Sequence, residues 1–364
     1  MQTEFGDRAP NGIRKYILPL QDLDTRNFLA LVVNIGSSIE NILEKGIAHF
    51  LEHMQMSFYD TKHALYGAFA HTDFYSTTYY FDIQKADITE IQKIIQCIIN
   101  GTYIEYANMD EIRNDILVEY DYYQRKRRYA DFECLLKGSE YERCFPIGKK
   151  SCINSFTRTQ LQHFFSKYYS LNNMALVWIA DQKTLSEFGT AWINQLKGIN
   201  TDYEIKNLGF KFKNGKQCVI NGTSKQDVAY YYYRKRQQGE EALDAMILLS
   251  IEETLQSYYS DIQLTKMFLS RNDEFIKVSF KEKVPYYDFI DKIECSKDTI
   301  MDKCIGMQKE PPIGYNCDAL REQLVNLFVF NDKVCQTENN ISFDYSLNTI
   351  EKTLKSVPFT IIHK

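Results

Sequence analysis

The chain has 364 residues, of which 44% are hydrophobic and 25% are charged, and these values exclude a wholly disordered protein. Its 43 basic and 48 acidic side chains give a net charge of −5 without a long block of either sign, which argues against a dedicated nucleic-acid-binding protein. No apolar run reaches the roughly 18 residues of a membrane span, and residues 1–12 are too polar for a secretory signal.

The first half of the chain alternates strand and helix patterns. A branched apolar run predicts a strand over 28–36, and apolar residues at helical spacing predict a helix over 47–56. The Thr- and aromatic-rich stretch 69–81 predicts a further strand. The elements expected after it are helices over 88–104, 109–136 and 156–169, a buried strand over 174–179 and a closing helix over 185–196.

Polar residues over 197–207 indicate a linker, after which the order of elements is repeated in outline. The elements expected there are strands over 217–220 and 228–233, a helix over 240–258, a strand over 275–280, and helices over 286–295 and 320–328. Both halves therefore mix strands and helices in a similar order, although no repeat is visible in the sequence letters. This pattern indicates a duplicated architecture with domains at residues 1–199 and 207–364.

The nine cysteines are odd in number, and no two stand at the C-x-x-C spacing of metal or redox motifs. Because the sequence shows no export signal, a disulfide framework is the weaker interpretation. We expect reduced thiols that mostly fill the core, and a cytoplasmic location for the protein.

The sharpest chemical pattern is a His-x-x-Glu-His motif formed by His49, Glu52 and His53 in the predicted helix 47–56. Residues four apart lie above one another on a helix, so the two histidines can offer their imidazole nitrogens to one metal ion. A catalytic zinc ion needs a further protein ligand and keeps one position for water, whose pKa it lowers toward about 7. Glu52 lies beside the pair and can take the proton from that water. The plainer alternative is a pair of histidines without a metal.

Glu119 is the best candidate for the missing ligand. In the predicted helix 109–136 it follows Ile116 in the apolar stripe, where an unpaired carboxylate would be costly. A metal ion would supply the cation that such a carboxylate needs. Pairing with Arg113 or Lys126, or simple exposure, remains the alternative. Three other carboxylates of this helix lie off the stripe and are interpreted as solvated charge: Glu111, Asp115 and Asp121.

Two segments of the chain carry a resemblance to a known family. Segment 46–54 resembles the inverted zinc motif of the pitrilysin, insulysin and mitochondrial processing peptidase family. Segment 113–119 resembles the second signature of that family, in which an Arg precedes the ligand Glu by six positions. The resemblance implies a zinc ion held by His49, His53 and Glu119, with Glu52 as the general base.

The resemblance also has implications for the fold. It implies an α+β protein of two similar α/β halves, each a mainly antiparallel sheet covered by helices, which together form one half of a clamshell. Residues 1–199 would then be the zinc-binding catalytic half, and residues 207–364 a diverged, non-catalytic half.

A third implication is that the cleaved peptide is held as an added strand on residues 69–80. Ala70, Thr72, Thr77 and Tyr79 fit the family's pattern of Ala, Thr, Thr and Tyr. An edge strand can bind an extended peptide through main-chain hydrogen bonds. The alternatives are a covered inner strand for this segment and an ordinary surface position for its histidine. The predicted substrate-binding residues are Phe69, Ala70, His71 and Thr72.

Three departures from the family pattern bear on function. Position 69 is Phe where the family has an Asn that contacts substrate, and position 112 is Ile where many members carry a further Glu. In the second half, segment 261–270 lacks the Arg and Tyr that grip the substrate and help polarise its carbonyl in the family. Because some members divide these roles between two subunits, the resemblance implies a heterodimer in which a related subunit supplies the Arg–Tyr pair. A homodimer is less favoured.

The sequence thus predicts a zinc metalloendopeptidase that cleaves extended peptides, with Zn²⁺ as its cofactor and with neither a nucleic-acid partner nor a membrane span. The reduced size and the expected two-subunit design favour leader-peptide removal during maturation of a ribosomally made peptide. The alternative from another class is a catalytically idle scaffold or peptide-binding subunit of a peptidase complex. A thiol enzyme is disfavoured because no cysteine has a motif-level neighbour.

Overall fold

The structure is a computed structural model of the chain, and it describes residues 5–20, 27–58, 67–83, 88–201, 208, 210, 212, 215–221, 227–235, 241–269, 273–281, 284–309 and 343–363. These residues divide into two compact units. The first comprises the chain up to Tyr122 and Arg143–Leu208. The second comprises Tyr123–Glu142 and the described parts of Gly209–Tyr315 and Cys335–Lys364.

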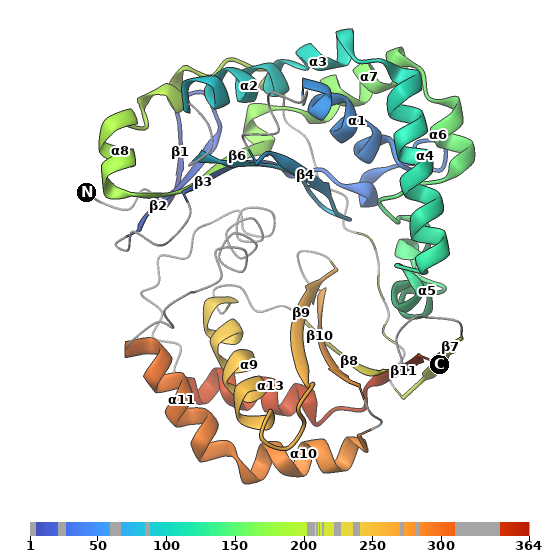
Figure 1. Cartoon of the computed structure of the whole chain (residues 1–364), viewed down its shortest axis with the longest axis vertical. Helices are drawn as coiled ribbons and strands as arrows, with labels where there is room; N and C mark the ends of the chain where they lie inside the picture. The colour runs from blue at the N-terminus through green and yellow to red at the C-terminus, as the bar shows by residue number, and fades with distance from the viewer. Residues whose placement is uncertain are drawn as a thin grey trace. The chain divides into compact units, whose positions relative to one another are not determined.

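The first unit contains a six-stranded sheet in the order β1-β2-β6-β3-β5-β4 (Figure 1). Neighbouring strands are antiparallel except β2 and β6, which run parallel. Strand β3 is buried along its whole length, as its unbroken apolar sequence predicts. The strands are β1 Phe5–Arg8, β2 Arg14–Leu20, β3 Phe28–Val33, β4 Phe69–Thr72, β5 Thr77–Asp82 and β6 Met174–Asp181.

Helices α1, α2 and α7 cover one face of this sheet (Figure 1). The core between the layers includes Leu31 of β3, Phe50 of α1 and Ile95 of α2, all without exposed surface. The α-helices are α1 Ile47–Gln55, α2 Ile88–Asn100, α3 Thr102–Tyr106, α4 Met109–Lys126, α6 Lys150–Ser155, α7 Arg158–Tyr168 and α8 Gln182–Phe188. The short 3₁₀ helices are η1 Ser37–Ile39, η2 Met56–Phe58, η6 Leu171–Asn173 and η7 Ala191–Gln195.

The second unit repeats the topology of the first. Its sheet has the order β7-β11-β8-β10-β9. If the strands of each sheet are numbered in chain order, from β2 in the first sheet and from β7 in the second, their spatial order in both sheets is first, fifth, second, fourth and third. In both sheets the first and fifth strands form the parallel pair. The structure therefore confirms the predicted α+β fold of two similar halves with mainly antiparallel sheets. The second unit contains α5 Ala130–Leu136, η5 Glu140–Arg143, β7 Gln217–Ile220, β8 Val228–Lys235, α9 Glu241–Leu255, β9 Gln263–Phe268, β10 Asp273–Phe280, α10 Tyr286–Cys295, α11 Lys297–Lys309, α13 Phe343–Leu354 and β11 Phe359–His363.

The stretch 69–81, predicted as one strand, is a β-hairpin of β4 and β5. The backbone N–H of Asp73 donates to the carbonyl of Ser76 at 2.7 Å and closes the turn between them, and Asp and Ser favour turns. Strand β4 lies at the edge of the sheet, whereas Thr77 and Tyr79 lie on the inner strand β5 and are buried. The prediction of a single edge strand reaching residue 80 is therefore wrong beyond Thr72.

Two of the long predicted helices are interrupted. Gly101 adopts a left-handed backbone with φ = 69° and separates α2 from α3. Arg127, with φ = 48°, separates α4 from α5. A single left-handed residue leaves the hydrophobic periodicity unchanged, so the sequence predicts continuous helices at both places. The second break has the larger consequence, because α5 belongs to the second unit.

Several α-helices and strands were not predicted, namely β1, β2, α6, β9, β11, α11 and α13. The helix predicted over 320–328 lies outside the described residues. None of the helices in the described parts of the chain combines the length and the apolar character that a bilayer crossing requires.

The prediction of reduced thiols is wrong for one pair. Cys134 of α5 and Cys218 of β7 form a disulfide across 84 residues of sequence. The pair was not predicted because the spacing of cysteines in the sequence does not show that α5 packs against the second sheet. Asp131 of α5 also pairs with His363 of that sheet at 2.9 Å.

Candidate metal centre

Helix α1 buries one face and presents a polar one. Its apolar residues Phe50, Leu51 and Met54 have no exposed surface and face the core. The motif residues project from the other side of the helix, yet His49 and Glu52 are 8% and 7% exposed. The motif is thus held in a largely buried position by a helix whose core contacts fix its orientation.

Glu40 holds the start of this helix. The backbone N–H groups of Gly46 and Ala48 donate to the two carboxylate oxygens of Glu40 at 2.9 and 3.0 Å. Helix N-termini have unpaired N–H groups that such an acceptor satisfies. Burial raises the pKa of Glu40 to about 8, although these two N–H groups oppose the rise. This residue was not predicted because it lies in a connection six residues before the helix N-cap.

The motif histidines and Glu119 converge on one point. His49 Nε2 and His53 Nε2 are 3.2 Å apart, and Glu119 Oε2 lies 3.4 Å from each of them. Ligands that each lie about 2.0 Å from a tetrahedral zinc ion are spaced about 3.3 Å from one another. The triangle formed by these three atoms therefore fits one zinc ion.

The contacts of Glu119 differ from the alternatives considered for it, namely a pair with Arg113 or Lys126, or simple exposure. Arg113 pairs with Asp110 at 2.6 Å and donates to backbone carbonyls. The Glu119 side chain is 33% exposed and is directed at the imidazoles of α1. The structure thus brings together from α1 and α4 the three side chains that the sequence proposes as ligands.

The electrostatics of the cluster favour a cation at its centre. Burial lowers the pKa of His49, but the hydrogen bond to Glu119 and the charges of Glu52 and Glu119 raise the pKa above its ordinary value. Burial raises the pKa of Glu119, but its hydrogen bonds to His49 and His53 hold the pKa far below the ordinary range. An ionised carboxylate that attracts positive charge onto buried imidazoles suits a metal ion that replaces the proton.

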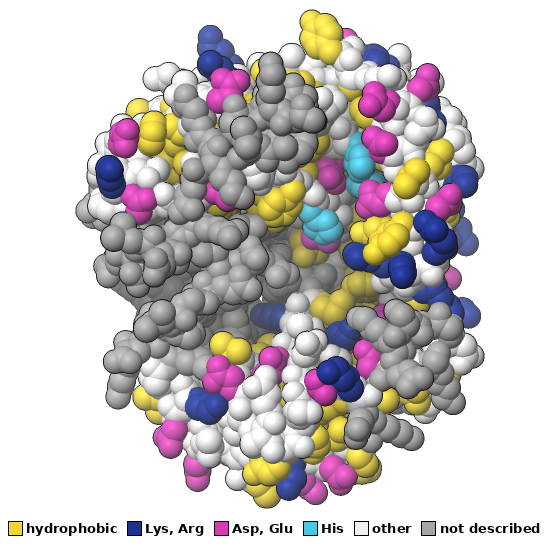
Figure 2. Space-filling view, viewed as in Figure 1, with side chains coloured by type: hydrophobic (Ala, Val, Ile, Leu, Met, Phe, Trp, Pro, Cys, Tyr) yellow, Lys and Arg dark blue, Asp and Glu magenta, His cyan; other side chains and the backbone are white. Residues whose placement is uncertain are grey.

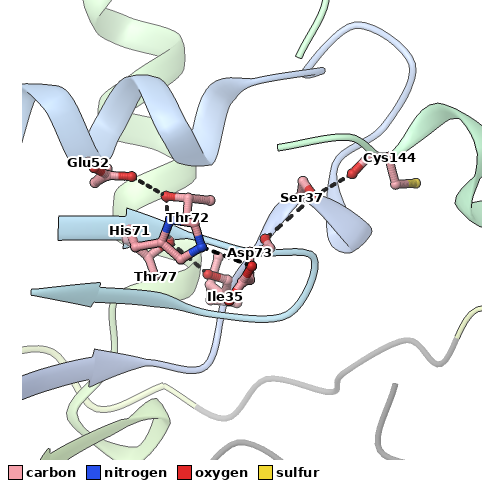
Figure 3. A network of polar contacts seen from close by, with 8 residues as sticks. All are labelled: Ile35, Ser37, Glu52, His71, Thr72, Asp73, Thr77 and Cys144. Carbon is pink, nitrogen blue, oxygen red and sulfur yellow. Dashed lines mark hydrogen bonds and ion pairs between the residues drawn. The ribbon is translucent and has the colours of Figure 1, made fainter. Parts of the chain in front are cut away.

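Glu52 lies beside this triangle and has a separate fixed partner. Its carboxylate and the two imidazoles place their donor atoms within 4.8 Å of one another. The hydroxyl of Thr72 on β4 donates to Glu52 Oε2 at 2.6 Å (Figure 3). The carboxylate is thereby oriented by the edge strand, as a proton acceptor next to a metal site should be.

Strand β4 is the edge strand that the sequence predicts, because β5 is its only neighbour in the described sheet. Thr72 points toward α1, so alternation places Ala70 on the same face and Phe69 and His71 on the opposite face. Phe69, where the family carries Asn, is 47% exposed, and its ring stacks on that of Tyr80 with centroids 4.5 Å apart. All four predicted substrate-binding residues therefore lie on the edge strand.

His71 forms an ion pair with Asp73 that raises its pKa. Its Nε2 lies 3.0 Å from Asp73 Oδ1 (Figure 3). The hydrogen bond to Asp73 raises the pKa of His71 to about 9, burial opposes the rise, and the charge of Asp73 adds to it. The edge strand therefore presents the His71–Asp73 ion pair on the face opposite the metal centre.

A pocket of about 560 Å³ adjoins the metal centre. Its lining includes Glu52 of α1, Ala70 of β4, Tyr106 of α3, and both Glu111 and Asp115 of α4. In the space-filling view, acidic side chains gather around the histidines where α1 and α4 face each other (Figure 2). Glu111 and Asp115 are exposed, as the sequence predicts, but their place in a pocket wall was not predicted because it depends on the packing of α3 and β4.

Residues 20–138 match the family described as Insulinase (Peptidase family M16). This range contains the His-x-x-Glu-His motif and Glu119. This part of the chain is similar to peptidase family M16. The family resemblance inferred from the two motif segments is thereby confirmed.

Relatives in family M16 match part of the chain. A zinc protease PQQL-like of Arabidopsis thaliana is 24% identical over 199 residues, which are 49% of this chain and 21% of that protein. Mitochondrial-processing peptidase subunit beta of Dictyostelium discoideum is 28% identical over 159 residues, which are 40% of this chain and 34% of that subunit. The matched part thus spans about a fifth to a third of the length of these relatives.

The fold is shared with a protease of known structure. The periplasmic protease PqqL from Escherichia coli is similar over 100% of this chain and 48% of its own chain, with a TM-score of 0.71 and 16% sequence identity. At this level of identity the similarity shows the fold alone.

Proposed function

We propose that the chain is the zinc-binding, catalytic part of a family M16 peptidase that cleaves peptides bound in an extended conformation. The observation that carries this proposal is the triangle of His49 Nε2, His53 Nε2 and Glu119 Oε2, with sides of 3.2, 3.4 and 3.4 Å. Two imidazoles and one carboxylate are the donor set of catalytic zinc sites in peptidases. The relative named as a zinc protease supports the same assignment.

Residues of the chain itself would carry out proton transfer and substrate binding. A zinc ion at this centre would polarise a peptide carbonyl and acidify water. Glu52 would take the proton from the attacking water and deliver it to the leaving amine, because its carboxylate lies beside the imidazoles and is oriented by Thr72. The backbone of β4 would hold the substrate as an added strand through main-chain hydrogen bonds.

Hydrolysis of unstructured peptides by the zinc-loaded chain tests this proposal, with the cleavage sites identified by mass spectrometry. Glu52→Gln preserves the size of the side chain and leaves the three ligands in place. We expect this variant to keep its zinc and to lose about 10²–10⁴-fold in turnover, the usual contribution of a general base. Glu90→Gln, which alters an exposed pair with Lys93 on α2, is the matched control. Undiminished turnover in Glu52→Gln would contradict the proposed role.

We also propose that a related subunit completes the site. Segment 261–270, which contains β9, has neither the Arg nor the Tyr that the family resemblance leads us to expect there. A missing donor to the developing oxyanion costs roughly 2.7–4 kcal/mol of barrier. The test compares peptide cleavage by the chain alone and with a co-encoded relative that contains the Arg–Tyr pair. Full activity of a strict monomer would contradict this part of the proposal.

The biological substrate that we propose is the leader segment of a ribosomally made peptide. A leader segment would be bound in the extended form that β-strand addition requires. Incubation with a precursor encoded next to this chain, followed by mass spectrometry, tests the assignment. Release of an intact leader supports it, whereas scattered cleavage of both leader and mature peptide contradicts it.

A further inference from the structure

We propose that Thr77 of β5 and Tyr169, the C-cap residue of α7, are positioning residues for proton transfer. They act through Thr72, whose hydroxyl orients the carboxylate of Glu52. This inference rests on the proposed peptidase function and extends the site into the layers behind the edge strand. Thr77 has no exposed surface and Tyr169 is 1% exposed, so neither can touch a bound peptide.

The β4–β5 hairpin places Thr77 next to Thr72. The two residues are cross-strand partners beside the turn, so their side chains lie on the same face of the sheet, toward α1. Their hydroxyl oxygens are 3.3 Å apart (Figure 3). The hydroxyl of Thr77 also donates to the carbonyl of Ile35, which follows β3, at 2.9 Å. Thr77 thereby connects the edge of the sheet to its inner strands.

The number of available protons gives these contacts a direction. A hydroxyl has one proton to donate, and an ionised carboxylate has none. The proton of Thr72 therefore goes to Glu52 Oε2 at 2.6 Å, and Thr72 Oγ1 can only accept from Thr77. The proton of Thr77 is shared between the oxygens of Thr72 and Ile35, so the oxygen of Thr77 is left as an acceptor.

Two buried tyrosines continue the chain of hydroxyls beyond Thr77. Tyr169 is hydrogen-bonded to the side chain of Thr77, and its hydroxyl oxygen lies 3.0 Å from that of Tyr79. Because the proton of Thr77 is already committed, Tyr169 donates to Thr77 and Tyr79 donates to Tyr169. Burial is the largest cause that raises the pKa of both tyrosines, and the charge of Glu52 raises both further. Both hydroxyls therefore keep the proton that the chain requires.

All four hydroxyls thus donate in the direction of one carboxylate, in the order Tyr79, Tyr169, Thr77 and Thr72. None of these residues is more than 3% exposed. In a dry interior, aligned hydrogen bonds polarise and strengthen one another. Because Oε2 of Glu52 is bound to Thr72, the direction of the other carboxylate oxygen follows from the Thr72 rotamer. Loss of a hydroxyl behind Thr72 should therefore slow proton transfer without weakening the binding of a peptide to the backbone of β4.

Steady-state hydrolysis by the zinc-loaded chain tests the role of each hydroxyl. Thr77→Val keeps the branched shape of its side chain, and Tyr169→Phe removes only the oxygen. We expect each to lower kcat about threefold to tenfold, the effect of one hydrogen bond, and to change KM by less than about twofold. Thr77→Ser restores the hydroxyl and should keep most of the activity. The controls are Thr78→Val, on the opposite face of β5, and Tyr168→Phe, at the adjacent position of α7.

Combination with Thr72→Val tests whether the effect passes through Thr72. Without that hydroxyl, a change at Thr77 or Tyr169 has no route to Glu52. Addition of Thr77→Val or Tyr169→Phe to Thr72→Val should therefore lower kcat by less than about twofold. Losses that multiply in the double variants would overturn the inference, because they would show effects independent of Thr72. Equal losses in the two control variants would overturn it as well.

The rotamer of Thr72 separates this inference from the proposed function, because its measurement needs no substrate. In protein labelled with ¹³C at the threonine methyl groups, NMR couplings through three bonds report this rotamer. We expect one rotamer in the unchanged chain and in Thr78→Val, and averaging between rotamers in Thr77→Val. If averaging occurs but the unchanged chain cleaves no peptide, the peptidase proposal fails and the positioning of Thr72 stands. If the rotamer stays single in Thr77→Val, the inference is overturned, and cleavage by the unchanged chain still supports the peptidase proposal.

Discussion

The hydroxyl of Thr72 on β4 donates a hydrogen bond to the carboxylate of Glu52 on α1, across 2.6 Å. Both side chains are buried, so the carboxylate has one fixed orientation. The strand proposed to bind the substrate therefore also orients the group proposed to move the proton. A peptide paired with β4 would reach Glu52 without a further rearrangement of either element.

Removal of this contact should lower the rate of hydrolysis. Thr72→Val keeps the branched shape of the side chain but has no hydroxyl. Because a hydrogen bond to a charged group contributes about 1.5–3 kcal/mol, we expect kcat to fall roughly tenfold or more. Thr72→Ser restores the hydroxyl and should keep most of the activity. Equal kcat values for the Val and Ser variants would show that the contact does not support catalysis.

Loss of the Glu40 carboxylate should loosen α1. Glu40→Ala leaves the N–H groups of Gly46 and Ala48 without their acceptor, and an unsatisfied buried donor costs about 1–3 kcal/mol. We expect the free energy of unfolding, measured with denaturant, to fall by about 2–4 kcal/mol, and zinc affinity to fall with it. Glu44→Ala, which removes a carboxylate from the same connection, is the control. If the two variants have the same stability, Glu40 does not hold the helix.

The His71–Asp73 pair should make stability depend on pH. The hydrogen bond to Asp73 raises the pKa of His71 to about 9, whereas an unfolded histidine titrates near about 6.5. The folded state therefore binds the proton more tightly, so the contribution is complete below about pH 6.5 and is lost as the pH rises through about 9.

The expected size of this effect is small because the side chains of His71 and Asp73 are 59% and 42% exposed and solvent screens them. The measurement is the free energy of unfolding of the zinc-loaded protein and its His71→Gln variant at pH 6.5, 8 and 10. The difference between the two proteins should shrink at the highest pH. A difference that grows between pH 6.5 and 10 would contradict the direction of the shift.

Sequence patterns predict the fold well where one feature dominates a segment. The apolar run of β3 and the helical spacing of α1 give elements close to those observed. The pattern fails at points set by single residues, such as Gly101 with φ = 69° and Arg127 with φ = 48°. It also misses β9, which pairs with the following strand β10, and β11, which pairs with β7 and β8 far away in the sequence.

The candidate site likewise contains residues that local sequence patterns predict and residues that they do not. The helical spacing of His49 and His53 and the buried stripe that leads to Glu119 are local properties, so the ligand set can be proposed from the sequence. The roles of Glu40 and Thr72 depend on contacts across loops and between layers, so no local sequence pattern predicts them. The charged pocket wall likewise exists because α3, α4 and β4 meet beside α1.

Zinc content combined with X-ray absorption at the zinc edge tests the ligand set of His49, His53 and Glu119 most directly. We expect about one zinc ion per chain, with imidazole nitrogen and carboxylate oxygen donors at about 2.0–2.1 Å, and loss of bound zinc in His49→Ala and Glu119→Ala but not in Glu90→Gln. A chain that binds no zinc, or one whose zinc affinity is unchanged by Glu119→Ala, would contradict the account.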